Sequence, residues 1–185
     1  MIVAVVLAAG GSRRLGRAKQ LVMYHGETLV QRTARIVRAA QVARVGIVLG
    51  ARAEDVWSSV AALPVERIDN TAWEEGMASS LRVGAAWASH QGASALLVCV
   101  CDQPQLTTDH LDALITSAGT TEIIGSAYRG AIGVPAIFPE SSFAALKAMT
   151  GDRGARALLV DQRAIAWEPG AFDIDEPADV ARLEP

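Results

Sequence analysis

The segment that follows the first apolar run of the chain has the composition of an anion-binding loop. Residues 7–19 read LAAGGSRRLGRAK, so three arginines and one lysine surround the glycines. Glycine lets backbone N–H groups turn toward an anion, and the basic side chains supply positive charge. The loop is therefore a candidate binding site for a triphosphate.

This loop differs from two common phosphate-binding motifs. Gly11 and Gly16 have the spacing of a Walker A loop, but Arg17 stands where that motif requires Lys, and no Ser or Thr follows Lys19. The dinucleotide fingerprint G-x-G-x-x-G is also absent. An ordinary strand-to-helix turn with surface arginines is the alternative interpretation. Lysine is rare in this chain, with only Lys19 and Lys147, which favours a specific task for the lysine in the loop.

Asp102 is a candidate metal ligand. It comes directly after the apolar run at residues 95–100, in Asp102-Gln103-Pro104. A carboxylate at that place costs free energy unless it is paired or bound to a metal. Mg²⁺ takes one or two carboxylates together with phosphate oxygens. A turn or helix-capping Asp before Pro104 is the alternative interpretation.

The elements that must position these residues alternate between strand and helix. Buried strands are predicted at residues 2–7, 45–49, 65–68, 95–100 and 164–167, and helices at 28–40, 53–60, 79–89, 107–117, 141–149, 155–160 and 176–183. Strands at 122–128 and 134–138, joined by 129–133, predict a hairpin. This alternation predicts a three-layer α/β/α domain with a mainly parallel mixed sheet. Ligands of such sheets lie beyond the carboxyl ends of the strands, where the loops after Leu7, Ile68 and Val100 meet.

Length and composition exclude several classes of protein. The 185 residues predict a single domain spanning residues 1–185. A net charge of −3 gives no broad positive field for nucleic acid and no polybasic segment for a membrane surface. Cys99 and Cys101 cannot form a disulfide framework and fit a reducing compartment. The basic residues follow the first apolar run instead of preceding it, unlike a signal peptide, so we expect a cytoplasmic protein.

Six motifs in order along nearly the whole chain resemble those of the MobA-like nucleotidyltransferases. The likeness is greatest to the MocA-like branch, which attaches CMP to the molybdenum cofactor. The motifs are Leu7-Ala8-Ala9-Gly10-x-Ser12-x-Arg14-x-Gly16-x-x-Lys19-x-Leu21, Asn70 through Gly76-Met77-x-x-Ser80-Leu81-x-x-Gly84, Cys101-Asp102-Gln103-Pro104, Gly133-x-Pro135-x-x-Phe138, Gly151-Asp152-x-Gly154-Ala155-Arg156 and Asp173-Ile174-Asp175-x-Pro177-x-Asp179.

The resemblance implies a Rossmann-like (GT-A-like) fold and a Mg²⁺-dependent reaction. CMP passes from CTP to the terminal phosphate of molybdopterin, and pyrophosphate leaves. Ala9 favours CTP, because the guanylyltransferases of the family usually have a second glycine there; GTP is the alternative. Val134 lies where the family often has His between Gly and Pro, which leaves another phosphorylated acceptor open. A recipient molybdoenzyme or its chaperone is a further partner that the family suggests.

The resemblance also assigns roles to residues. Lys19 binds the β- and γ-phosphates, Arg14 assists it, and Asp102 and Asp175 hold Mg²⁺, with Asp173 as the alternative to Asp175. The residues expected to contact the nucleotide are Leu7, Ala8, Ala9, Gly10, Gly11, Ser12, Arg13, Arg14, Lys19, Asn70 and Ser80. A non-catalytic carrier of the cofactor is the rival from another class, and it would need neither metal carboxylate.

The histidines and most tryptophans are not expected to take part in chemistry. His25, His90 and His110 are isolated in the sequence, without a Ser or Cys at the spacing of a nucleophilic triad. Trp73 is the one tryptophan that we expect near the site, since it lies between Asn70 and Gly76.

Overall fold

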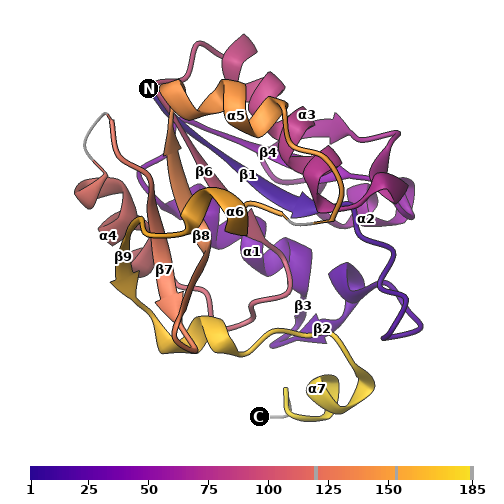
Figure 1. Cartoon of the computed structure of the whole chain (residues 1–185). Helices are drawn as coiled ribbons and strands as arrows, with labels where there is room; N and C mark the ends of the chain where they lie inside the picture. Colours follow the sequence, from indigo (N-terminus) through magenta and orange to yellow (C-terminus); the bar gives the residue numbers. More distant parts are fainter. Residues whose placement is uncertain (119–120, 153, 184–185) are drawn as a thin grey trace.

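The computed structural model describes residues 1–118, 121–152 and 154–183 and contains a seven-stranded sheet (Figure 1). The strand order is β5-β4-β1-β6-β8-β7-β9. The strands are β1 (Ile2–Ala8), β4 (Arg44–Leu49), β5 (Glu66–Asp69), β6 (Ala95–Val100), β7 (Ile124–Tyr128), β8 (Ala131–Pro139) and β9 (Arg163–Ala166), and β2 (Met23–Tyr24) pairs with β3 (Glu27–Thr28) in a separate hairpin. Within the described part of the seven-stranded sheet, β8 alone runs antiparallel to its neighbours, β6 and β7. The predicted mixed, mainly parallel sheet is confirmed.

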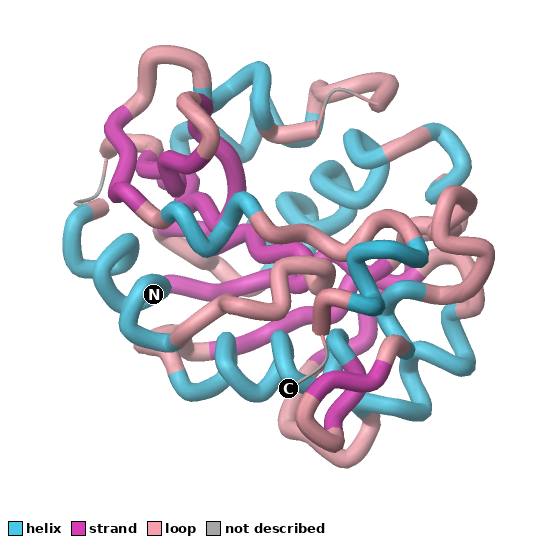
Figure 2. The backbone as a smooth tube through the Cα atoms, turned by 90° about the horizontal axis from the view of Figure 1, so that it is seen from below, coloured by secondary structure: helices cyan, strands magenta, loops and turns pink. Residues whose placement is uncertain are grey.

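Helices cover both faces of the sheet (Figure 2). They are α1 (Leu29–Ala39), α2 (Ala53–Val60), α3 (Met77–His90), α4 (Thr108–Ser117), α5 (Phe143–Lys147), α6 (Arg156–Leu159) and α7 (Pro177–Ala181). Side chains of α1, α2 and α4 share one buried cluster with the strands, and those of α3, α5 and α6 share another. Among the described residues, no helix combines the length and the apolar character needed to cross a bilayer.

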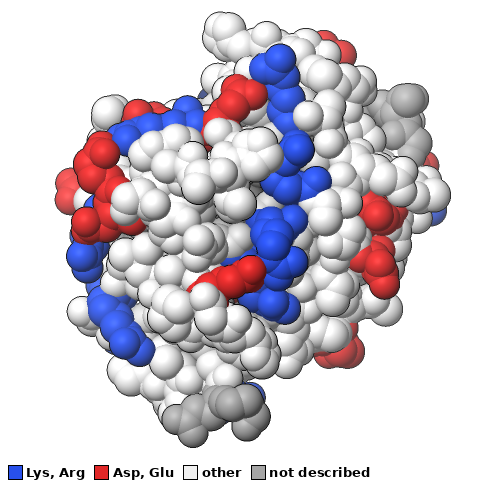
Figure 3. Space-filling view, turned by 180° about the vertical axis from the view of Figure 1, so that it is seen from behind, with Lys and Arg blue, Asp and Glu red and all other residues white. Residues whose placement is uncertain are grey.

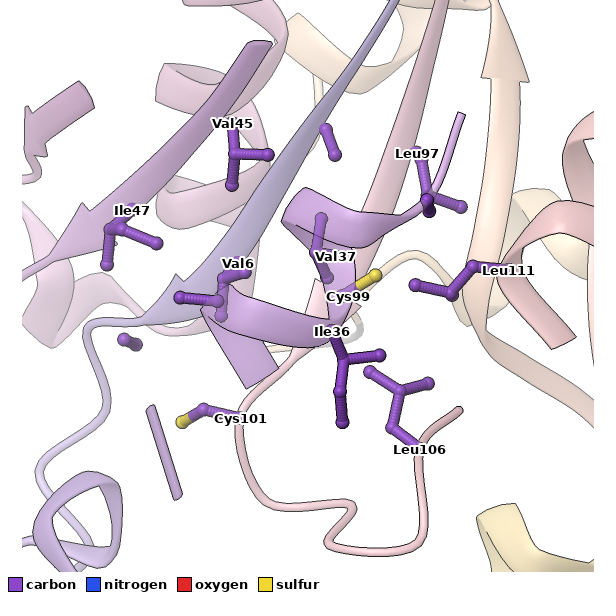
Figure 4. Packing of buried hydrophobic residues seen from close by; sticks show 14 of the residues in the cluster. Val6, Ile36, Val37, Val45, Ile47, Leu97, Cys99, Cys101, Leu106 and Leu111 are labelled. Carbon is purple, nitrogen blue, oxygen red and sulfur yellow. The ribbon is translucent and has the colours of Figure 1, made fainter. Parts of the chain in front are cut away.

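The central strands are buried on both faces because their apolar residues are continuous. Along β1, Ala4 and Val6 belong to the cluster with α1, whereas Val3 and Val5 belong to the cluster with α3. Figure 4 shows the first cluster, in which strand residues such as Val6 lie against α1. A continuous apolar run of this kind is typical of a covered parallel sheet.

The basic side chains are not spread evenly over the surface. On the face turned away from the view of Figure 1, several Lys and Arg side chains form a band down the middle, others lie toward the left edge, and acidic side chains lie beside both (Figure 3). Charges of both signs therefore occupy this face, in agreement with the small net charge of −3.

Most predicted elements are present, but several of their boundaries differ. The helix α2 and the strand β6 have the predicted bounds, and Thr28 and Gln31 form a capping box that begins α1. The predicted connection at 129–133 is wrong, because the turn consists of Arg129 and Gly130 alone, both at positive φ (51° and 68°). The hairpin β2–β3 was not predicted. The helix α3 begins two residues early, at Met77, and α7 ends early, at Ala181.

His110, isolated in the sequence, has a serine and a tryptophan as neighbours in the fold. Its Nε2 lies 2.7 Å from Ser126 Oγ, and its ring stacks on Trp167 with centroids 4.5 Å apart. Ser126 Oγ donates its hydrogen to the carbonyl oxygen of Pro135 at 2.6 Å, so the histidine nitrogen is the donor to Ser126. The pair is buried and structural, because the serine proton is already committed to a backbone acceptor. Burial lowers the pKa of His110 to about 4.

This buried histidine predicts a loss of stability in mild acid. The folded state keeps His110 neutral down to about pH 4, whereas the unfolded chain binds a proton near pH 6.5. The free energy of unfolding therefore falls as the pH drops through this window. Between pH 7 and pH 5 we expect a loss of about 2 kcal/mol from this group.

Urea unfolding at the two pH values measures this loss. The variant His110→Gln has no titrating side chain there and is expected to lose about 2 kcal/mol less than the wild type between pH 7 and pH 5. The exposed His90 supplies the control variant His90→Gln, which keeps the wild-type pH dependence. Equal losses in the wild type and in His110→Gln would contradict the assignment.

Candidate active site

A cavity of about 470 Å³ lies at the carboxyl ends of β1 and β6. These two strands are parallel neighbours, with Leu7 opposite Val100, so the loops that follow them leave the sheet side by side. The residues that line the cavity are Leu7, Ala8, Ala9, Gly10, Gly11, Ser12, Arg13, Arg14, Lys19, Gln20, Trp73, Glu74, Glu75, Gly76, Met77, Ser80, Val100, Cys101, Asp102, Asp152 and Asp175. All the expected site residues except Asn70 are in this set.

Four charged side chains form a connected cluster in the cavity: Lys19, Asp102, Asp175 and Arg14. The Nζ of Lys19 lies 2.5 Å from Asp102 Oδ2 and 3.8 Å from Asp175 Oδ1. Arg14 forms an ion pair with the other oxygen of Asp175. Burial is the largest single influence and lowers the pKa of the Lys19 ammonium, but the charge and hydrogen bond of Asp102, together with the charge of Asp175, act in the opposite direction, and the pKa is raised above its usual value. Lys19 therefore stays charged at neutral pH.

Asp175 reaches this cluster through a contact between distant parts of the chain. The backbone N–H of Ile174 donates to the carbonyl oxygen of Asp102 at 2.9 Å, which places the next residue beside the first carboxylate. The Ile174 side chain is fully buried in a small cluster with Leu15 and Val22. The helix α7, which begins two residues after Asp175, lies beside the β2–β3 hairpin (Figure 1).

Asp173 points to a different environment from Asp175. It is half-exposed, lies outside the cavity lining, and its Oδ1 is 3.8 Å from Arg129 Nη1. Of the two candidates for a second carboxylate, Asp175 is the one that the fold brings to Asp102.

Gln20 is a site residue that the sequence reasoning missed. It is buried, and its Nε2 donates to two carbonyl oxygens of the loop, Ala8 O at 2.9 Å and Gly10 O at 2.7 Å. Ser12 Oγ accepts a hydrogen bond from the N–H of Lys19 at 3.0 Å and lies 3.4 Å from Gln20 Oε1. The sequence signal that could have identified Gln20 is its position: an amide side chain, able to bond backbone groups, directly after Lys19 at the end of the glycine-rich loop.

Asn70 does not line the cavity but forms hydrogen bonds with residues near it. Its side-chain amide donates to Ser79 Oγ at 2.8 Å and to Ser80 Oγ at 3.1 Å, and its Oδ1 accepts from the N–H of Ala72. The side chain is buried and does not line the cavity, whereas Ser80 does. The expected direct contact between Asn70 and the nucleotide has no support in this geometry.

Trp73 lies at the cavity, as expected from its position between Asn70 and Gly76. A Cβ placed on Gly11 would lie only 3.2 Å from its ring, so the absence of a side chain at Gly11 lets the indole approach the loop. The neighbouring residues Glu74 and Met77 also line the cavity and were not predicted.

Comparison with known proteins identifies the family of this chain. The model of the MobA-like NTP transferase domain matches residues 4–165. The nicotine blue oxidoreductase of Paenarthrobacter nicotinovorans is 34% identical over 98% of this chain and 96% of that protein. The purine catabolism protein PucB of Bacillus subtilis is 32% identical over 85% of this chain and 80% of that protein.

A solved structure has the same fold. Rv0371c from Mycobacterium tuberculosis superimposes with a TM-score of 0.85 and 32% identity, covering 98% of this chain and 96% of that chain. A structure of the same protein in complex with manganese gives a TM-score of 0.81 and 29% identity, covering 98% and 97%.

Proposed function

Because the chain belongs to the MobA-like NTP transferase family, we propose that its cavity binds CTP with Mg²⁺ and transfers CMP to the terminal phosphate of molybdopterin. One observation carries the proposal: a glycine-rich loop, a lysine and two carboxylates from distant parts of the chain converge in one cavity. Phosphoryl and nucleotidyl transfer depend mostly on positioning and on neutralising charge, and this set supplies both.

The proposed step is an in-line displacement at phosphorus. An oxygen of the acceptor phosphate forms a bond to the α-phosphorus of CTP while the bond to the bridging oxygen breaks, so that pyrophosphate leaves. Lys19 and Arg14 balance the charge of the β- and γ-phosphates, and the amides of Gly10 and Gly11 contribute donors. Ser80 and Trp73 line the same cavity, and we propose that they contact the ribose or the base.

The donor set fits a hard divalent cation. Asp102 and Asp175 both lie within 3.8 Å of the same ammonium nitrogen, so one positive ion can interact with both carboxylates. Mg²⁺ is held by one or two carboxylates, with water and phosphate oxygens as its other ligands. Bound there, Mg²⁺ would neutralise phosphate charge. A related protein has been solved in complex with manganese, which supports the use of a divalent metal.

The identity of the base and of the acceptor is the finer part of the proposal. Ala9 favours CTP, and GTP is the second candidate. One relative is named for purine catabolism and the other as an oxidoreductase, and neither name mentions molybdopterin. Another phosphorylated acceptor is therefore the alternative. The pairing of Lys19 with two carboxylates speaks against a carrier without catalysis. A recipient molybdoenzyme or its chaperone would accept the product.

Calorimetric titration with CTP, GTP, ATP and UTP, with and without Mg²⁺, tests this function. We expect CTP with Mg²⁺ to bind at least about tenfold more tightly than the other three, a difference of about 1.4 kcal/mol. Release of pyrophosphate from CTP on addition of molybdopterin then tests the acceptor. Preference for GTP would keep the reaction class and change the product, whereas failure to bind any nucleotide, with or without molybdopterin, would favour the carrier.

A further inference from the structure

Gln20 holds the anion-binding loop at two alternate peptide units. It lies in the short 3-10 helix at Lys19–Leu21, and one nitrogen, Nε2, donates to both Ala8 O and Gly10 O. The side chain is 1% exposed, so water does not compete for these bonds. Both loop carbonyl groups are thereby turned toward the interior of the protein.

Because the peptide bond is planar, fixing the direction of a C=O group also fixes the direction of the N–H group of the next residue. In a trans peptide unit the C=O and the following N–H point in opposite directions. The only cis peptide bond among the described residues is Val134-Pro135, so the units 8–9 and 10–11 are trans. The N–H groups of Ala9 and Gly11 must therefore point away from the Gln20 amide.

The N–H of Gly11 is a donor that the protein does not use. Within residues 1–118, 121–152 and 154–183, it makes no hydrogen bond to backbone or side chain. The carbonyl between the two held units, Ala9 O, is itself fixed by the N–H of Ala51 at 3.0 Å. Three successive loop carbonyls are thus held by the protein, and the donor of Gly11 is left for a ligand.

The geometry points to Gln20 as a positioning residue that aims the Gly11 amide at the phosphates of the nucleotide. In this role, that of an anion cradle, a neutral side chain, whose amide nitrogen is bonded to the loop backbone, fixes backbone donors before the anion arrives. This inference rests on the proposed function, because it assumes that the loop binds a polyphosphate. Gln20 then determines affinity for the phosphates and leaves the contacts to the base unchanged.

Binding of inorganic tripolyphosphate tests the cradle without the base or the sugar. The variant Gln20→Met keeps the length of the side chain and removes both hydrogen bonds. We expect it to weaken tripolyphosphate and CTP by the same factor, at least about tenfold, the worth of one hydrogen bond to a charged group. The exposed Gln41 supplies the matched control Gln41→Met, for which both affinities stay at the wild-type value.

A second measurement uses the unaltered protein and so does not depend on the variant folding. In the ¹⁵N-labelled wild type, the Gly11 amide resonance is expected to shift on addition of tripolyphosphate.

Three results would overturn the inference: an unresponsive Gly11 amide, unchanged tripolyphosphate affinity in Gln20→Met, or a wild type that does not bind tripolyphosphate. Failure of the proposed function has a different signature. A wild type whose tripolyphosphate binding depends on Gln20, but which transfers no nucleotide, would keep the cradle and exclude the transferase.

Discussion

Replacing Asp102 by Asn is expected to lower the rate of the proposed CMP transfer by about a thousandfold, the upper range for removal of one group that stabilises a transition state electrostatically. Asn has nearly the shape of Asp but lacks the negative charge of the carboxylates that usually hold Mg²⁺. Lys19 also loses the carboxylate 2.5 Å from its ammonium, which disturbs the cluster that faces the phosphates. The rate of pyrophosphate release from CTP in the presence of molybdopterin and Mg²⁺ measures the effect.

The matched control for this variant is Asp173→Asn. Asp173 lies two residues from Asp175 but outside the cavity, so its replacement is expected to keep the wild-type rate. Near-ultraviolet circular dichroism confirms that both variants are folded. A wild-type rate for Asp102→Asn, or a large loss for Asp173→Asn, would show that the two carboxylates have been assigned to the wrong roles.

Replacing Lys19 by Ala is expected to weaken the binding of CTP by roughly 10- to 100-fold, the worth of a hydrogen bond between charged groups. The binding of CMP is expected to change by less than about threefold, because CMP lacks the β- and γ-phosphates that we propose the ammonium contacts. Calorimetric titration of the variant with CTP and CMP gives the two ratios.

Lys147→Ala is the control for the loss of a lysine. Lys147 ends α5, its Nζ donates to Ser89 Oγ at 3.2 Å, and neither residue lines the cavity, so both nucleotides are expected to bind as in the wild type. If Lys19→Ala weakened CTP and CMP by equal factors, Lys19 would belong near the α-phosphate or the sugar.

The fold was largely predictable because most strands are continuous apolar runs between polar loops. Residues 95–100 satisfy that pattern without interruption, and β6 has the predicted bounds. The hairpin between β7 and β8 was harder to predict. Its turn places Arg129 at a positive φ, which a non-glycine residue rarely adopts, so the sequence pattern extended the turn to Gly133.

The site was predictable where chemistry depends on residue type and was missed where it depends on hydrogen-bond partners. Lys19 and Asp102 carry charges that need an explanation in any loop or strand end, and the fold brings them together. A buried amide has no such signature. Gln20 and Asn70 have the same functional group, yet one fixes the loop backbone and the other fixes Ser79 and Ser80, and only the tertiary structure distinguishes them.

The charges of Lys19, Arg14, Asp102 and Asp175 sum to zero within one small cluster. Paired charges of this kind produce a field that falls off steeply, and dissolved ions screen what is left within about 10 Å at 0.1 M salt. A nucleotide diffusing toward the cavity therefore experiences little long-range attraction from these four groups. Their contribution to binding the proposed nucleotide is therefore confined to close range, where a phosphate can replace a carboxylate as the partner of Lys19 or Arg14, and we expect these four groups to add little to the dependence of the association rate on ionic strength.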